Sequence, residues 1–218
     1  MNAPCTVIVL AAGASSRFAG PGHKLTQPLD GPGDEHTVLG VTLRNVLASR
    51  LPVVVVTSAE IAPLAERLLG AERVLRTAPQ RNRGIGDSIA AGVASQGEAA
   101  GWLVLPADMP RVRPQTFLRV AEALKMHAVA YAQQRGRRGH PVGFSAELYS
   151  ELVALTGDEG ARRLVARYPA QAVEVEDPGV LQDIDTQHDL ALLRGVYGGH
   201  SGHGGHAVPD RNESWRAS

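Results

Sequence analysis

The sequence is poor in the features that define several large protein classes. A single cysteine, Cys5, excludes an internal disulfide and a cysteine-based zinc site. Cys5 stands at the start of an apolar run, where we expect it to pack in the interior. No stretch approaches the roughly 18 apolar residues that a membrane-spanning helix requires. The N-terminus has no basic segment followed by an apolar one, so we expect no signal peptide and a cytoplasmic location.

The sequence also has no excess of positive or of negative charge. Lys and Arg total 22, Asp and Glu total 22, and the formal net charge is zero. This balance argues against a non-specific nucleic-acid binder and against a basic membrane-binding surface. We therefore expect no nucleic-acid partner and no membrane partner, and any anionic ligand must be held by locally placed charges.

What the chain does contain is a regular alternation of apolar strands and helices. Buried strands are predicted at 6–13, 51–58, 72–78 and 101–108, with further strands around the polar turn RGRRG and at QAVEVED. Amphipathic helical segments separate most of them, and in the segment 86–95 Asp87 or Ser88 could cap the start of the helix. The pattern predicts an α/β, three-layer Rossmann-like fold, with a mostly parallel sheet and helices on both faces.

The pattern ends near the C-terminus. We expect one domain over residues 1–197 and a flexible Gly/His-rich tail over 198–218, because Gly, His and polar residues bury too little apolar area to offset ordering entropy. Three tail histidines spaced three residues apart allow loose binding of a divalent metal or simple solvation.

In sheets of this kind, ligands bind beyond the carboxyl ends of the strands. The first strand is followed there by VLAAGASSRFAGPGHKL, residues 9–25, in which glycines such as Gly13 let the backbone approach a ligand closely. Arg17 offers a planar fork and Lys24 a point charge for phosphate oxygens. The loop follows neither of the two common phosphate-binding signatures, so an ordinary turn with solvated charges is the alternative.

Carboxylates follow two other strands. Asp108 lies in PADMP, where it could bind a hard cation or cap the next helix. Asp183 and Asp185 lie in DIDT, and their spacing would turn both to one side of an extended segment. Asp185 could be a second metal ligand or the cap of the final helix. Together with the glycine loop, these residues predict a site for a nucleotide and Mg²⁺.

The chain resembles a known family at these positions. LAAGASSRFAG…HKL is similar to the LAAG-x-S-x-R-M-G-x-x-K loop of the molybdenum cofactor nucleotidyltransferases, and PADMPRV, GHPVGFS, GDEGARRL and DIDTQHDL resemble further motifs of that family in the same order. The likeness spans residues 6 to about 194. Phe18 departs from the usual Met, and Lys24 lies two residues farther from Arg17 than in the compact motif, so FAGPGH must bulge.

The resemblance implies transfer of a nucleoside monophosphate from an NTP to the phosphate of molybdopterin, with Mg²⁺ as the cofactor and pyrophosphate as the second product. Three residues would act in catalysis: Lys24, Arg17 and Asp108. Asp108 and Asp185 would hold the metal. The resemblance places these residues at the nucleotide: Leu10, Ala11, Ala12, Gly13, Ser15, Ser16, Arg17, Lys24, Gly86, Ser88 and Asp108.

Family members that use CTP tend to read LAAG and those that use GTP tend to read LAGG, so Ala12 favours CTP here. The second substrate, molybdopterin, would contact His140, Asp158 and Arg162. The alternatives are that His140 is a structural residue and that GDEGARRL is a plain helix start with a solvated basic face. The product would pass to a molybdoenzyme or its chaperone. The alternatives are a GTP-using enzyme, an enzyme with another acceptor such as a sugar phosphate, and a non-catalytic relative that binds a nucleotide or serves redox chemistry on another heterocycle.

Overall fold

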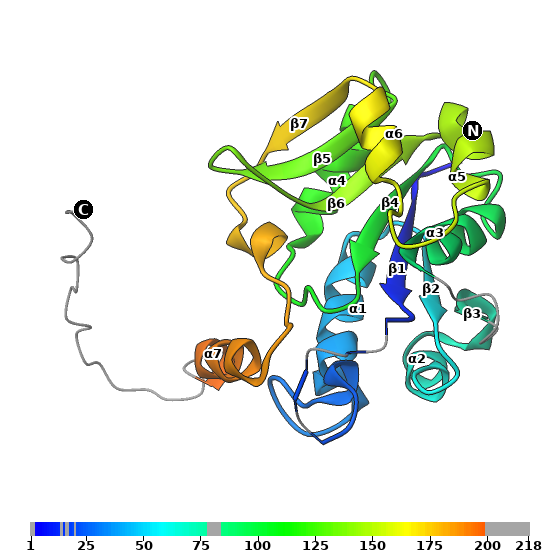
Figure 1. The fold of residues 1–218 in the computed structure, drawn as a ribbon. Helices are drawn as coiled ribbons and strands as arrows, with labels where there is room; N and C mark the ends of the chain where they lie inside the picture. Colours follow the sequence, from blue (N-terminus) through cyan, green and yellow to red (C-terminus); the bar gives the residue numbers. More distant parts are fainter. Residues whose placement is uncertain (1–2, 14, 16–17, 20, 78–83, 199–218) are drawn as a thin grey trace.

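The described part of the chain forms one seven-stranded sheet with helices on both faces (Figure 1). The computed structural model describes residues 3–13, 15, 18–19, 21–77 and 84–198. The strands are β1 (Thr6–Ala11), β2 (Val53–Thr57), β3 (Val74–Arg76), β4 (Gly101–Pro106), β5 (Val129–Gln134), β6 (Arg137–Ser145) and β7 (Ala170–Glu174). Their order across the sheet is β3-β2-β1-β4-β6-β5-β7.

The sheet is mostly parallel, as the sequence predicts. β1 lies between β2 and β4 and is parallel to both, with Val9 paired to Val55 on one side and to Leu105 on the other. A strand with neighbours on both edges and helices on both faces is shielded from water, which explains its apolar run; every side chain of β1 is buried except that of Leu10, which is half-buried. The three-layer α/β fold is therefore confirmed.

Among the described strands, β6 alone runs against the others. It pairs antiparallel with β4 and with β5, and a tight turn after Gln134 joins it to β5. Because β6 is reversed, its first residues lie beside the carboxyl end of β4. A segment from the second half of the chain thus reaches the edge of the sheet where β1 and β4 end.

The helices form two layers (Figure 1). They are α1 (Val38–Ala48), α2 (Ala62–Leu69), α3 (Ile85–Ala94), α4 (Pro114–Ala123), α5 (Tyr149–Val153), α6 (Arg162–Arg167) and α7 (Gln187–Gly198), with short 3-10 turns η1 (Lys24–Thr26), η2 (Asp34–His36), η3 (Ala71–Arg73), η4 (Ala146–Leu148) and η5 (Pro178–Leu181). One core packs α1, α2, α4 and α7 against the sheet, and a second packs α3, α5 and α6 against the opposite face. No helix in the described ranges has the length and apolar character needed to cross a bilayer.

Helix ends follow local chemistry in most places. Pro114 occupies the first turn of α4, and Gly70 ends α2 with φ of 88°. The start of α3 differs from the expectation of a cap at Asp87 or Ser88, because the cap position is Gly84 and has no side-chain hydrogen bond. The Asp87 carboxylate instead accepts a hydrogen bond from the backbone N–H of Gly157, 70 positions away. A long-range contact has replaced the local cap.

The flexible tail expected over residues 198–218 falls almost wholly on residues 199–218, which lie outside the described part of the chain. The division into a domain and a tail therefore stays a prediction.

Candidate active site

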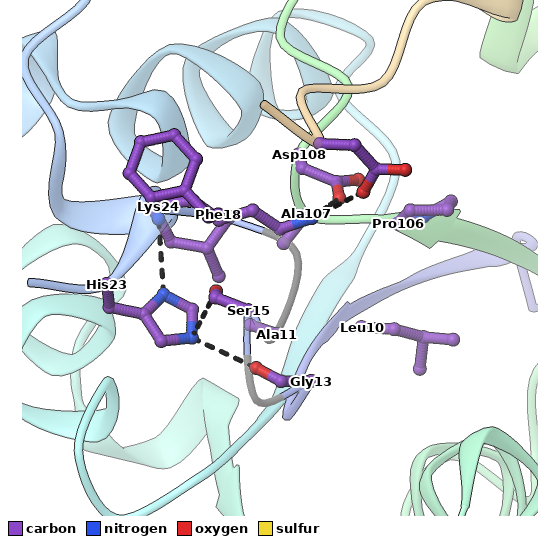
Figure 2. A pocket seen from close by; sticks show the side chains of 12 residues that line it. Leu10, Ala11, Gly13, Ser15, Phe18, His23, Lys24, Pro106, Ala107 and Asp108 are labelled. Atoms are coloured by element: carbon purple, nitrogen blue, oxygen red, sulfur yellow. Dashed lines mark hydrogen bonds and ion pairs between the residues drawn. The ribbon is translucent and has the colours of Figure 1, made fainter. Parts of the chain in front are cut away.

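A cavity of about 220 Å³ opens beyond the carboxyl ends of β1 and β4 (Figure 2). Both strands supply walls directly, and the segments that follow them supply the polar groups. The lining residues are Leu10, Ala11, Gly13, Ser15, Phe18, His23, Lys24, Leu25, Pro106, Ala107, Asp108 and Asp185. The cavity therefore lies where parallel sheets bind their ligands.

Lys24 contacts two carboxylates in this cavity. Its Nζ lies 2.5 Å from Oδ2 of Asp108 and 3.2 Å from Oδ1 of Asp185, residues that are 84 and 161 positions away in the chain. Lys24 begins η1, so the long FAGPGH segment does return the lysine to the site. The side chains of Lys24 and Asp108 are each 14% exposed, which keeps their attraction from being screened by water.

A backbone hydrogen bond holds the segments that carry Asp108 and Asp185 next to each other. The N–H of Ile184 donates to the carbonyl of Asp108 at 3.0 Å, which joins the DIDT segment to the end of β4. Thr186 and Asp189 cap α7 reciprocally, since the Asp189 carboxylate accepts from the Thr186 N–H and the Thr186 hydroxyl accepts from the Asp189 N–H. The final helix therefore does not need Asp185 as its cap.

Asp108 fits a divalent cation. Its Oδ1 is buried and has no hydrogen-bond partner among the described residues, although Oδ2 contacts Lys24. Burial raises the pKa of Asp108, and the charge of Lys24 only partly opposes it. A hard cation at Oδ1 would stabilise the ionised carboxylate, and Asp185 is close enough to the same ammonium to supply a second oxygen.

The pKa of Lys24 moves upward. Burial alone would lower it, but the charge of Asp108 and the hydrogen bonds to Asp108 and Asp185 outweigh burial. Lys24 therefore stays a cation at neutral pH and can neutralise phosphate oxygens.

His23 is a site residue that the sequence analysis missed. Its Nδ1 accepts from the N–H of Leu25 at 3.2 Å, so in the neutral ring Nε2 carries the proton and donates to the carbonyl of Gly13 at 2.9 Å. The Ser15 hydroxyl lies 2.9 Å from the same Nε2 (Figure 2). The buried imidazole of His23 thus joins both ends of the glycine loop. The one sequence signal for this role is that His23 directly precedes Lys24.

The structure brings most of the expected nucleotide residues together. Leu10, Ala11, Gly13, Ser15, Lys24 and Asp108 all line the cavity, and so does Asp185. Ser16 and Arg17 lie outside the described residues. Ala12, Gly86 and Ser88 are not among its described lining residues. Gly86 instead donates its N–H to the carbonyl of Gly157 at 2.9 Å, so the start of α3 is tied to the loop before α6.

A second cavity, of about 530 Å³, adjoins the first and shares Pro106 with it. Its walls are apolar side chains of α3, β4, β6 and α6, and its polar lining includes all three residues expected at the second substrate, His140, Asp158 and Arg162. Burial and the charge of Arg138 lower the pKa of His140 to about 4. His140 is therefore neutral at physiological pH.

Two adjoining cavities at the carboxyl edge of a mostly parallel sheet, one with a buried cation between two carboxylates, define a nucleotidyltransferase-type enzyme. The family model of the MobA-like NTP transferase domain matches residues 7–202, and the chain belongs to this family.

The chain is also similar to known proteins in sequence and in fold. The chain is 32% identical over 209 residues to the purine catabolism protein PucB of Bacillus subtilis, covering 89% of this chain and 98% of PucB. The structure is similar to that of Rv0371c from Mycobacterium tuberculosis, with 27% identity, a TM-score of 0.69 and coverage of 88% and 98%. Rv0371c has also been solved in complex with manganese, at a TM-score of 0.69 and 24% identity, covering 89% of this chain and 100% of that one. A nucleotidyl transferase from Methanothermobacter, Mth528, shares the fold at a TM-score of 0.74 and 24% identity, covering 91% and 99%.

Proposed function

We propose that this protein transfers CMP from CTP to the phosphate of molybdopterin and releases pyrophosphate, with Mg²⁺ as the cofactor. The observation that carries the proposal is the position of Lys24 against Asp108 and Asp185, in a cavity that adjoins a larger one through Pro106. The smaller cavity suits the triphosphate, and the larger, mainly apolar cavity suits a pterin.

In this proposal the acceptor phosphate is the nucleophile. One of its oxygens forms a bond to the α-phosphorus in line with the bond to the leaving pyrophosphate, which breaks with both electrons moving to pyrophosphate. An ionised phosphate oxygen needs no general base, so the protein has to align the groups and neutralise charge. Lys24 would neutralise the leaving oxygens, and N–H groups of the glycine loop would hold the triphosphate.

Asp108 and Asp185 would hold the divalent metal, which when bound polarises the phosphates and offsets their charge. The unpartnered Oδ1 of Asp108 supports this assignment. The manganese complex of Rv0371c supports a divalent metal in this fold. The molybdoenzyme that receives the product is proposed to act in purine breakdown, in keeping with the name of PucB.

The preference for CTP is proposed on Ala12, where GTP-using members of the family tend to have glycine. Ala12→Gly should raise the kcat/KM for GTP relative to CTP by about 10-fold or more, since one methyl group contributes about 1–3 kcal/mol to discrimination. Competition between the two nucleotides in a pyrophosphate-release assay measures the ratio. An unchanged ratio would remove Ala12 as the determinant.

The deciding experiment is pyrophosphate release from the full chain with molybdopterin and each of the four NTPs, in Mg²⁺, in Mn²⁺ and in EDTA. We expect CTP to be the preferred donor and EDTA to stop the reaction. Release that requires GTP, or that requires a sugar phosphate in place of molybdopterin, would replace the substrate assignment. Nucleotide binding without pyrophosphate release under any of these conditions would indicate a non-catalytic relative.

A further inference from the structure

Arg138 is an exposed cation on the wall of the second cavity. Its guanidinium carbon lies 4.9 Å from the centre of the Tyr131 ring, on the neighbouring strand β5. This cation–π contact orients the side chain without using its hydrogen-bond donors. Among the described residues, no carboxylate lies within ion-pair distance of Arg138, whereas Arg163 and Arg167 on α6 each pair with a glutamate.

Strand alternation explains how Arg138 and His140 come to line one cavity, since they lie on the same face of β6 as Val142 and Phe144. The pairing of β5 with β6 is irregular at this point. The register shifts between Tyr131 and Gln133, so that one residue of β5 faces the three residues 139–141 of β6. Bulges of this kind re-aim side chains next to binding sites. Gly139 lies at this point, and a Cβ there would come within 2.2 Å of the carbonyl oxygen of Val180, so η5 packs directly on the bulge and fixes it.

The reversed direction of β6 places Arg138 at the reactive edge of the sheet. Val142 pairs with Val104 of β4, so Arg138, four residues earlier, lies farther toward the carboxyl end of β4 and toward Asp108. An anion held by Arg138 would therefore face the first cavity. Ring systems bound deeper would contact apolar side chains such as Val104 and Phe144.

The charges around the cavity favour Arg138 as the anion-binding group on this side. His140 is neutral at physiological pH, so it adds hydrogen bonding but no charge. The acidic residues on the cavity wall, Asp158 and Glu159, come from the loop before α6, where Glu159 pairs with Arg163 and Arg162 adds a second cation to the wall. Asp183 is exposed and within electrostatic reach of His140, where its charge acts on the pKa of His140 in the direction opposite to Arg138.

We propose that Arg138, oriented by Tyr131, binds the phosphate of the acceptor and sets the selectivity of the second cavity for a heterocycle that carries a phosphomonoester. This inference rests on the proposed function, because it assigns the larger cavity to the acceptor. Arg138 is then a specificity residue for the second substrate and makes no contribution to nucleotide binding.

Arg137 provides a matched control, since it is the adjacent exposed arginine of β6 and does not line the cavity. The test titrates molybdopterin into the full-length, nucleotide-free protein under anaerobic conditions and follows pterin fluorescence. Arg138→Gln should weaken the Kd at least 10-fold, Arg138→Lys should weaken it less because the charge is kept while the planar fork is lost, and Arg137→Gln should stay within twofold of wild type. Tyr131→Phe, which keeps an aromatic face, should also stay near wild type, and Tyr131→Leu should not.

The affinity for CTP, measured separately, should be the same in all of these variants. A Kd for molybdopterin in Arg138→Gln that matches Arg137→Gln would overturn the inference, as would an equal loss of CTP affinity or a wild-type protein that does not bind molybdopterin. If wild type binds molybdopterin but releases no pyrophosphate, the proposed function fails, while the role of Arg138 is still decided by the ratio of the two Kd values.

Discussion

At the scale of single residues, Asp108 has the most specific environment in the site. One of its oxygens contacts the Lys24 ammonium and the other is buried without a partner among the described residues. A structural ion pair would satisfy both oxygens, because an unpartnered buried acceptor costs free energy. The arrangement therefore supports the proposed role of Asp108 as a ligand of a divalent cation.

Asp108→Asn should lower the kcat/KM for metal-dependent pyrophosphate release by about 100-fold or more, because a neutral amide is a poor ligand for a hard cation. The unfolding free energy should fall by only about 1–3 kcal/mol, since Lys24 keeps Asp185 as a partner. Steady-state kinetics and urea denaturation measure the two effects. Asp183→Asn is the control, as that carboxylate is exposed, and it should retain activity within a few-fold. Wild-type turnover in Asp108→Asn would refute the metal assignment.

His140 should make the stability of the protein depend on pH. Its pKa is about 4 in the fold, below its ordinary value of 6.5, because of burial and the charge of Arg138, while Asp183 acts in the opposite direction. The unfolded chain therefore takes up a proton between pH 6.5 and 4 that the folded protein does not. Stability from this group is complete above pH 6.5 and falls by about 3 kcal/mol as the pH drops to 4.

The measurement is the difference in unfolding free energy between wild type and His140→Gln from pH 7.5 to pH 4. The difference should shrink or reverse as the pH falls, since the variant lacks the titrating group. Parallel curves for the two proteins would show that His140 is protonated normally in the fold.

The sequence could predict those site residues whose positions follow strand ends or motifs, such as Lys24 and Asp108. It could not predict the role of His23, because that role depends on which ring nitrogen accepts from Leu25 and on how the glycine loop folds back over it. It misassigned the start of α3 for a related reason. The local sequence predicts that Asp87 caps the helix, but its carboxylate accepts a hydrogen bond from the N–H of Gly157, which only the completed fold brings near.

At the scale of elements, the packing of α3 on the sheet depends on a small residue. A Cβ at Gly92 would come within 2.6 Å of Cγ2 of Ile8 on β1 and 3.1 Å of Cγ2 of Val56 on β2. Close approach between this helix and the two strands is thus built into the second core. The same helix carries Ile85 and Ile89 to the wall of the larger cavity, so its distance from the sheet sets the width of that cavity.

Gly92→Ala should lower the unfolding free energy by about 1–2 kcal/mol, because overpacking outweighs the gain in helix propensity. Gly195 on α7 is the matched control, since nothing lies within 4 Å of a Cβ there. Gly195→Ala should raise the unfolding free energy by about 0.5–1 kcal/mol. Urea denaturation compares the two variants with wild type. Stabilisation by both substitutions would show that α3 can move away from the sheet without loss.

Most elements were predictable because each apolar run between breakers has one clear period, and six of the seven described strands fall within the predicted segments or at their edges. The start of β6 was predicted wrongly, because this strand begins at Arg137, inside the segment RGRRG that was expected to be a turn. The order of the strands is another matter. The reversal of β6 follows from the short turn RGRRG, but its insertion between β4 and β5 depends on pairings such as Trp102 with Phe144, which no local pattern encodes.

At the scale of the whole molecule, we propose that the folded domain ends near residue 197 and that residues 198–218 add nothing to its stability. The family model ends close to this point, at residue 202. Deleting residues 199–218 should leave the Tm within about 1 °C, since a change of 1 kcal/mol in a domain of this size shifts Tm by roughly 2–4 °C. Scanning calorimetry of the full-length and shortened proteins measures this. A Tm lower by 4 °C or more would place the tail in the fold.

The reversal of β6 has a consequence for how proteins with this fold can diverge. The smaller cavity, proposed for the donor, is lined by β1, β4, the segments that follow these two strands and the segment before α7, while the larger cavity, proposed for the acceptor, is lined by α3, β4, β6 and the residues from Asp158 to Val165. Substitutions on one side of Pro106 can accumulate without disturbing the other. If the proposed function holds, proteins with this layout can change their acceptor through the larger cavity and keep the nucleotide-binding residues of the smaller one.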